Sequence, residues 1–273
     1  MNTGCSTAPK LSLLIDILKE MQSAVIAYSG GVDSTFLLKA SALSGIRTLA
    51  VTGVSPAMPE QDLLDAGKAA HLMGISHRVI ETSEVDSDDF RKNPPDRCYY
   101  CKSELFGRLK GIAESEGYRH VIDGSNLDDL DDWRPGRRAA SENNVRSPLT
   151  EAGLRKKDIR SLSRELDLPT WDKPSSPCLS SRFPYGEPIT VDALRRVESA
   201  EKFLRSLGFG ELRVRHHGDT ARVELREEEI PVMLKPEIRM LVTEKLRALG
   251  YHFVTLDLEG FRSGKLNIRK SEG

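Results

Sequence analysis

The stretch from Ser23 to Ala40 constrains this chain most, because it joins an apparent buried strand to a helix through a glycine-rich turn. Residues 23–28 (SAVIAY) form a short apolar run that is typical of a buried strand, and residues 35–40 (TFLLKA) favour an amphipathic helix. Between them, residues 29–34 (SGGVDS) combine two glycines, which allow a tight turn, with two hydroxyls. The start of the helix adds free N–H groups and the positive end of its dipole, so we expect this turn to bind a phosphate.

Composition excludes several other kinds of protein. The 273 residues are 38% hydrophobic, which is enough for one large domain or two small ones. The formal net charge of −1 does not favour a large nucleic-acid-binding surface. No apolar run is long enough to span a membrane, and residues 1–10 lack the apolar core of a signal peptide. We therefore expect a cytoplasmic, reducing setting with no membrane and no nucleic-acid partner.

Alternating strand and helix patterns predict the fold of the first part of the chain. Strands are expected at residues 23–28, 46–52, 76–81, 120–123 and 145–148, and helices at 11–21, 35–40, 60–73, 99–116 and 156–166. Such alternation is typical of an α/β fold with a doubly wound parallel sheet, here over residues 1–170. Ligands bind these sheets beyond the carboxyl ends of the strands, which is where residues 29–34 would lie.

A change of composition marks the end of this domain. Residues 171–188 (WDKPSSPCLSSRFPYGEP) are rich in proline and serine, have no periodicity and include Cys178, so they are expected to form an interdomain loop. Residues 189–273 then predict a smaller α+β C-terminal domain. Its expected helices cover 190–207 and 238–249, and its strands 211–216, 221–225 and 253–256, with a hairpin turn at 217–219.

Cysteines form the first group of candidate chemical residues. In a reducing compartment the four cysteines point to metal binding, catalysis or burial rather than to disulfides, and Cys5 lies in an expected loose tail. Cys98 and Cys101 form a C-x-x-C pair, which could bind a metal or cluster, act as a redox dithiol, or simply be buried. A zinc site would need further ligands, for which His77 and His120 are candidates. With Cys178, three thiolates could hold a 4Fe–4S cluster and leave one iron open.

Charged residues supply three further candidates. Arg182 and Lys173 flank Cys178 closely enough to favour its thiolate. Residues 123–136 (DGSNLDDLDDWRPG) follow the fourth expected strand, where Gly124 would admit a nucleotide. Asp128 and Asp129 could there hold Mg²⁺, with the arginines at 134, 137 and 138 facing an anion, although a solvated acidic turn is an equally good interpretation.

The last candidates lie in the C-terminal domain. Strand alternation places Arg213 and Arg215 on one face, which suits a phosphate but also fits a solvated strand.

These motifs together resemble a known family more specifically than any one of them does. SGGVDS (29–34) resembles the pyrophosphate loop of the PP-loop ATP pyrophosphatases. In order with DGSNLDDLDDWRPG (123–136), PCLSSRFPYG (177–186) and LRVRHHGD (212–219), it makes nearly the whole chain similar to the LarE family of ATP-dependent sulfur transferases. The resemblance implies an enzyme that takes part in the synthesis of the nickel-pincer nucleotide, which is the cofactor of lactate racemase. Its substrate would be pyridinium-3,5-biscarboxylic acid mononucleotide. Each carboxylate would be adenylylated by ATP with Mg²⁺ and then converted to a thiocarboxylate.

The resemblance also implies roles for individual residues. It identifies Ser29, Gly30, Gly31, Asp33 and Ser34 as the pyrophosphate loop, Gly124, Ser125 and Asn126 as a second nucleotide-side motif, and Arg213 and Arg215 as a phosphate-binding pair. Cys178 matches the cysteine that delivers sulfur, and we assign Asp33 and Arg182 to the catalytic group with it. The family's oligomers imply a homo-oligomer.

Sulfur delivery is the point on which alternatives remain. Cys98 and Cys101 resemble the branch in which three cysteines, Cys178 included, carry a 4Fe–4S cluster supplied by a sulfide donor. The alternative is a sacrificial enzyme in which Cys178 gives up its own sulfur. A tRNA thiolation enzyme and a non-catalytic nucleotide or cluster sensor are the other two functions considered.

Overall fold

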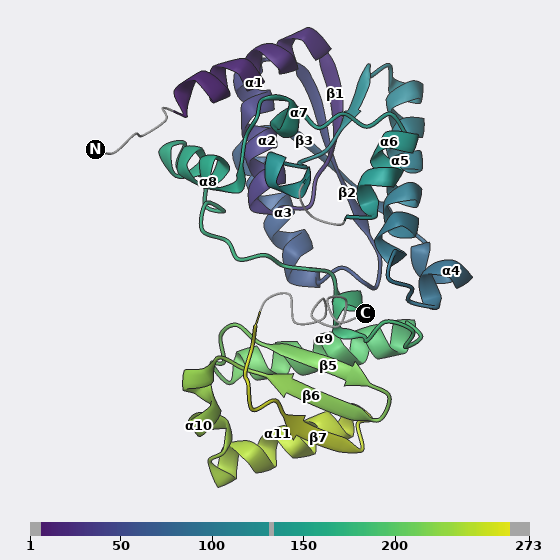
Figure 1. Ribbon diagram of the computed structural model, residues 1–273, viewed down its shortest axis with the longest axis vertical. Helices are drawn as coiled ribbons and strands as arrows, with labels where there is room; N and C mark the ends of the chain where they lie inside the picture. The colour runs from purple at the N-terminus through teal and green to yellow at the C-terminus, as the bar shows by residue number, and fades with distance from the viewer. Residues whose placement is uncertain (1–6, 131–133, 263–273) are drawn as a thin grey trace. The chain divides into compact units, whose positions relative to one another are not determined.

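The computed structural model describes residues 7–130 and 134–262 (Figure 1). Cys5 and the acidic-turn residues 131–133 therefore lie outside the described residues. The described residues form two compact units, the first within residues 7–84 and 96–176 and the second within 85–95 and 177–262. The expected interdomain loop is thus divided, with 171–176 in the first unit and 177–188 in the second.

The first unit is built on a parallel sheet whose order is β3-β2-β1-β4. Its strands are β1 (Ser23–Ala27), β2 (Arg47–Val54), β3 (Ser76–Glu81) and β4 (His120–Ile122). The chain moves outward from β1 to β3 and then returns to the other side of β1 for β4. The strand order therefore reverses between β1 and β4, and this reversal is where ligands bind in such sheets.

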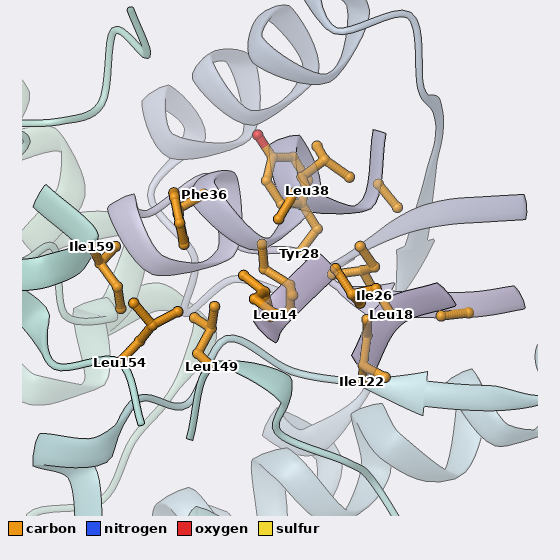
Figure 2. Packing of buried hydrophobic residues seen from close by; sticks show 14 of the residues in the cluster. Leu14, Leu18, Ile26, Tyr28, Phe36, Leu38, Ile122, Leu149, Leu154 and Ile159 are labelled. Carbon is orange, nitrogen blue, oxygen red and sulfur yellow. The ribbon is translucent and has the colours of Figure 1, made fainter. Parts of the chain in front are cut away.

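Helices cover both faces of this sheet. They are α1 (Ala8–Met21), α2 (Val32–Ser44), α3 (Glu60–Leu72), α5 (Arg97–Glu116), α6 (Gly136–Glu142), α7 (Pro148–Glu151) and α8 (Lys156–Glu165), with the short turn η2 (Leu127–Leu130). Ala24 and Ile26 of β1 pack on the α1, α2 and α8 side, where Figure 2 shows Ile26, whereas Val25 packs against α5 and α6. Alternate residues of one strand thus enter two cores, and the expectation of a doubly wound α/β fold is confirmed.

One expected strand is not present. Residues 145–148 make a single bridge, between Arg146 and Ile122, instead of a fifth strand. The reason is that Pro148 has no N–H to give to a sheet and begins α7.

The second unit has its own small sheet and its own core. It contains η1 (Glu84–Asp86, shared with the first unit), α4 (Asp88–Arg91), η3 (Leu179–Arg182), α9 (Val191–Ser206), β5 (Arg213–His217), β6 (Thr220–Glu224), η4 (Glu227–Glu229), α10 (Ile230–Met233), α11 (Pro236–Ala248) and β7 (Phe253–Leu256). β5 and β6 form the expected antiparallel hairpin, and β7 adds in parallel to β6. Leu204 of α9, Val223 of β6 and Leu246 of α11 are buried in one cluster.

Residues 85–95 join this second unit although they come early in the chain. Asn93 is buried and its side chain donates to the carbonyl of Pro184 at 2.7 Å. Backbone N–H groups of Gly186 and Ile189 bond the same segment at the carbonyls of Asn93 and Arg91. Among the described residues, no helix is long and apolar enough to cross a membrane.

Candidate active site

The turn at residues 29–34 leads from the carboxyl end of β1 into α2. Gly30 has φ +69°, and a Cβ there would lie 2.8 Å from the Cβ of Ala66 on α3. Only glycine therefore fits at this position, on both backbone and steric grounds. Gly31 is the N-cap of α2, and as a glycine it has no side chain to cap the first N–H groups of that helix. The turn thus keeps the amides and the helix dipole that an anion needs.

Two hydroxyls hold the shape of this turn. The side-chain oxygens of Ser29 and Ser34 lie 3.1 Å apart, and the Ser34 hydroxyl donates to the carbonyl of Gly31 at 3.2 Å. The N–H of Gly31 donates to the Ser29 hydroxyl at 3.4 Å. The serines therefore preorganise the loop that the sequence identified.

The loop after β4 lies directly against the start of α2. A Cβ on Gly124 would be 3.0 Å from the amide nitrogen of Ser34, so the two loops touch at backbone level. Asp123 organises this second loop by accepting the hydroxyls of Ser125 and Ser147, each at 2.7 Å. The structure therefore brings the two motifs that the sequence placed 90 positions apart to one edge of the sheet, as expected for a switch point.

Asp33 is the central charged group at this edge. Its Oδ2 accepts a hydrogen bond from the Nζ of Lys156, the first residue of α8, at 2.6 Å. Its Oδ1 is buried and has no hydrogen-bond partner within residues 7–130 and 134–262. Burial raises the pKa of Asp33 above its ordinary value, and the charge of Lys156 opposes that rise. An unpartnered carboxylate oxygen beside a phosphate loop fits a Mg²⁺ ligand, because Mg²⁺ binds through one or two carboxylates together with phosphate oxygens and water.

A second lysine closes the other side of the loop. The Nζ of Lys173 lies 3.1 Å from Asp62, 3.4 Å from Asp65 and 3.5 Å from the carbonyl of Gly30. The sequence suggested that Lys173 acts on the Cys178 thiol, but its bonds run to α3 and to the phosphate loop. A pocket of about 180 Å³ lies here, lined by Ser29, Gly31, Val32, Asp33, Asp62, Lys156, Lys173, Pro174, Ser175 and Ser176.

The acidic turn after β4 is used within the protein itself. Asp128 accepts the Nη1 of Arg155 at 2.5 Å and the backbone N–H of Lys156 at 2.8 Å. Asp129 accepts the N–H of Asn126 at 3.0 Å and pairs with Arg134 at 2.8 Å. These carboxylates are bonded within the protein, and the Mg²⁺ role suggested for Asp128 and Asp129 stays a prediction. Asn126 is buried and shapes the turn by accepting the N–H of Asp128 at 2.9 Å.

The cysteines lie in two places. Cys98 and Cys101 stand one helical turn apart near the start of α5 in the first unit, the former exposed and the latter half-buried. Positions three apart share one helix face, so both thiols can reach one ligand. Cys178 is exposed at the start of η3 in the second unit. Within residues 7–130 and 134–262 no group of three His, Cys, Asp or Glu side chains forms a metal site, so the structure itself shows no cluster site.

Arg182 fixes the backbone of the Cys178 loop. Its side chain is 2% exposed and forms a two-pronged pair with Glu201, with Nε to Oε1 at 2.8 Å and Nη2 to Oε2 at 3.0 Å. Its Nη1 donates to the carbonyls of Pro177 and Cys178 at 2.6 and 3.1 Å. The arginine thus holds main-chain atoms beside Cys178, and its assignment to the catalytic group stays a prediction.

The two arginines of β5 have different surroundings. Arg215 is 5% exposed and donates to Glu224 and to the carbonyl of Ser181, both at 2.8 Å. Arg213 is half-buried, and no ion pair joins it to a carboxylate in the described part of the chain. Burial lowers the pKa of Arg213 to about 10, and the charge of Arg182 adds to that shift. Arg213 is therefore the member of the pair with charge left for an anion.

Two known proteins are similar to this chain over nearly its whole length. No protein-family model matches the chain. A pyridinium-3,5-bisthiocarboxylic acid mononucleotide synthase of Lactiplantibacillus plantarum is 41% identical over 262 residues, which cover 95% of this chain and 94% of that protein. An uncharacterized protein of a Synechocystis strain is 47% identical over 259 residues, 94% of this chain and 97% of the other.

More distant similarities cover only part of the chain. A tRNA-specific 2-thiouridylase of Xanthobacter autotrophicus is 29% identical over 217 residues, 65% of this chain and 55% of that protein. The solved structure of an NMN synthetase from Francisella tularensis matches with a TM-score of 0.50 at 20% identity, covering 63% of this chain and 76% of the other. At that identity the likeness concerns the fold alone, and it agrees with the doubly wound sheet described above.

Proposed function

This chain belongs to the LarE family of ATP-dependent sulfur transferases, and we propose that it makes pyridinium-3,5-bisthiocarboxylic acid mononucleotide from the corresponding biscarboxylic acid. The observation that carries the proposal is the near full-length similarity to a synthase named for that product. The pocket at the carboxyl end of β1 supports it, because its loop, lysines and aspartates suit a nucleoside triphosphate with Mg²⁺.

Activation of the substrate is the first half of the proposed reaction. A carboxylate is a poor electrophile, so a carboxylate oxygen attacks the α-phosphorus of ATP and pyrophosphate leaves. The loop from Ser29 to Ser34 would hold the β- and γ-phosphates through its amides and hydroxyls. Asp33 would hold Mg²⁺ through its unpartnered oxygen, and the metal would neutralise the charge on departing pyrophosphate.

Delivery of sulfur is the second half. The acyl-adenylate is attacked by a sulfur nucleophile, AMP leaves, and a thiocarboxylate remains. We propose that Cys98, Cys101 and Cys178 ligate a 4Fe–4S cluster, and the donor set supports this because iron–sulfur clusters are bound by cysteine thiolates. With these three cysteines as its protein ligands, the cluster would supply an iron at which a sulfide could bind. Arg182 would keep the backbone at Cys178 in place during this step.

Recognition of the substrate phosphate is assigned to β5. Arg213 carries charge that no carboxylate pairs among the described residues, so it would contact the phosphate. Arg215 is bonded to Glu224 and Ser181 and would orient the strand.

One experiment tests both halves. Anaerobically purified protein is analysed for iron and acid-labile sulfide, then given ATP, Mg²⁺, sulfide and substrate, and the nucleotide product is identified by mass spectrometry. The proposal expects repeated formation of the bisthiocarboxylate with unchanged protein mass. Cys98→Ser should lose the cluster, whereas Cys5→Ser, at a cysteine without an assigned role, should keep it.

Two results of that experiment would correct the account. A protein lighter by about 34 Da after one turnover would mean that Cys178 gives up its own sulfur and becomes dehydroalanine. Absence of any thiocarboxylate with fully loaded protein would reject the function.

We also propose that the protein is a cytoplasmic homo-oligomer and that a sulfide donor supplies its sulfur. Light scattering on the purified protein tests the assembly.

A further inference from the structure

Residues 171–176 are the last segment of the first unit, and their contacts have no part in the chemistry assigned above. The segment follows α8 and passes the phosphate loop, where Nζ of Lys173 lies 3.5 Å from the carbonyl of Gly30. Lys173 and the three residues after it line the pocket. Cys178, which the proposed function uses for sulfur, comes two residues after Ser176 in the chain. The segment therefore leads directly from the pocket to the sulfur-bearing residue.

Asp62 ties this segment to α3 through both oxygens of its carboxylate. Its Oδ1 lies 3.1 Å from Nζ of Lys173, and its Oδ2 accepts the hydroxyl of Ser176 at 2.7 Å. The side chain of Asp62 is 16% exposed and lies in the first turn of α3, where the helix dipole favours a negative charge. One charged group thus holds two residues of the segment, and hydrogen bonds to a charged group are stronger than neutral ones.

Arg160 of α8 holds the beginning of the same segment. Its Nη1 donates to the carbonyl of Trp171 at 2.8 Å, and its Nη2 donates to the carbonyl of Lys173 at 2.9 Å. The bond of Ser176 to Asp62 then fixes the point at which the chain leaves the first unit. Two residues of chain span at most about 7 Å, so the position of Ser176 limits where the backbone of Cys178 can lie.

The position of the sulfur matters because an acyl-adenylate also reacts with water. Water attacks the acyl carbon, AMP leaves and the carboxylate is restored, so ATP is consumed without any thiocarboxylate. A sulfur nucleophile held at the acyl carbon outcompetes water through its high effective concentration, and a displacement of about 1 Å can cost about 10²-fold in rate. A fixed segment beside the pocket would favour sulfur in this competition.

We propose that Asp62 is a positioning residue that couples the consumption of ATP to sulfur delivery. It does so by holding Lys173 and Ser176, so that the chain leading to Cys178 starts from a fixed point beside the phosphate loop. The inference rests on the proposed function. It applies both to sulfur from Cys178 itself and to sulfur from a cluster that Cys178 ligates, since Cys178 takes part in either route.

The uncoupled fraction, defined as the share of AMP formed without thiocarboxylate, tests this role. Anaerobically purified protein is given ATP, Mg²⁺, sulfide and pyridinium-3,5-biscarboxylic acid mononucleotide, and both products are quantified. Ser176→Ala should raise the uncoupled fraction about two- to tenfold, the size expected for one lost hydrogen bond. Ser176→Thr keeps the hydroxyl and should keep the wild-type fraction. Partial unfolding lowers both products together, so it would leave this fraction unchanged.

Ser161→Ala is the matched control for this measurement. It removes another exposed serine–carboxylate bond, to Glu165 on α8 at 3.2 Å, and should leave the uncoupled fraction at its wild-type value.

Hydrogen–deuterium exchange on the full chain tests the restraint without substrate. Asp62→Ala removes both bonds, so the backbone amides of residues 171–178 should exchange about two- to tenfold faster, while Ser161→Ala should exchange as the wild type does.

Unchanged exchange in Asp62→Ala, or a wild-type uncoupled fraction in Ser176→Ala, would overturn the inference. A wild-type protein that forms no thiocarboxylate would instead reject the proposed function. An active wild type whose Ser176→Ala variant stays fully coupled would reject the inference alone.

Discussion

Two ion pairs, one in each unit, show how the same chemistry serves different ends. In the first unit the side chains of Asp33 and Lys156 are 23% and 38% exposed, and one oxygen of Asp33 has no partner in the described part of the chain. In the second unit Arg182 and Glu201 are each 2% exposed. Oε1 of Glu201 also accepts the N–H of Val214 at 3.1 Å, and its Oε2 accepts Arg205 at 3.0 Å. Removing one partner from a buried, fully bonded pair is costly, whereas a pair near solvent with an open oxygen is able to exchange partners.

The largest effect is expected from breaking the complete pair. Glu201→Gln leaves the buried guanidinium of Arg182 without its counter-charge, so the free energy of unfolding should fall by about 3–5 kcal/mol. Chemical denaturation followed by circular dichroism measures this. Glu228→Gln, at an exposed carboxylate 3.7 Å from Arg226, should change stability by less than about 0.5 kcal/mol. Equal effects of the two variants would refute the contrast.

Breaking the incomplete pair should instead cost activity. Asp33→Asn removes the proposed metal ligand, and substrate-dependent pyrophosphate release should drop about 10²–10³-fold, the size typical of lost transition-state electrostatics. Stability should stay within about 1 kcal/mol of wild type, because the carboxylate was poorly solvated and only partly bonded. A variant that unfolds, or that keeps its rate, contradicts this assignment.

Two adjacent glycines of the phosphate loop, Gly30 and Gly31, should differ in how much an added methyl group destabilises the protein. Gly30→Ala must place a Cβ 2.8 Å from that of Ala66 at φ +69°, so it should cost about 1–3 kcal/mol of unfolding free energy. At Gly31 the added Cβ meets only the Ser29 hydroxyl, at 3.4 Å. Gly31→Ala should therefore cost about 0.5 kcal/mol or less. Thermal melts of both variants test the order, and a reversal would show that the loop is held differently.

The smallest expected effect is on the pH dependence of the free energy of unfolding, to which Asp33 and Glu201 should contribute with opposite signs. Burial raises the pKa of Asp33 in the folded protein, so this group binds more protons when folded and lowers stability as pH rises above an aspartate's ordinary pKa. For Glu201, burial alone would raise the pKa, but Arg182 and Arg205 hold it below its ordinary value. Glu201 therefore adds stability above a glutamate's ordinary pKa, and that stability is lost as pH falls through the lowered value.

Melting temperatures between pH 3 and pH 7, compared with Asp33→Asn and Glu201→Gln, would separate the two slopes. If Asp33 and Glu201 changed the melting temperature with pH in the same direction, the direction of the pKa shift given above for one of these two groups would be wrong.

Local chemistry made much of this structure predictable from sequence. The β1–loop–α2 unit was recognisable because glycine, serine and strand residues act on neighbours only a few positions away. Lys156 was not recognised, since its partner Asp33 lies 123 positions earlier and only the folded sheet edge joins them. The same holds for residues 85–95, which join the second unit through Asn93 and Pro184, 91 positions apart. Arg213 and Arg215 share a strand face as expected. Which of the two is bound to a carboxylate depends on Glu224, whose buried side chain pairs with Arg215 in the folded protein.

The central claim is that the edge around Asp33 activates a carboxylate with ATP by releasing pyrophosphate. The most direct measurement is to separate the nucleotide products after incubating the protein with ATP, Mg²⁺ and pyridinium-3,5-biscarboxylic acid mononucleotide. The account predicts AMP and pyrophosphate in equal amounts, formed only when the substrate is present. Formation of ADP and inorganic phosphate, or pyrophosphate release that ignores the substrate, would contradict it.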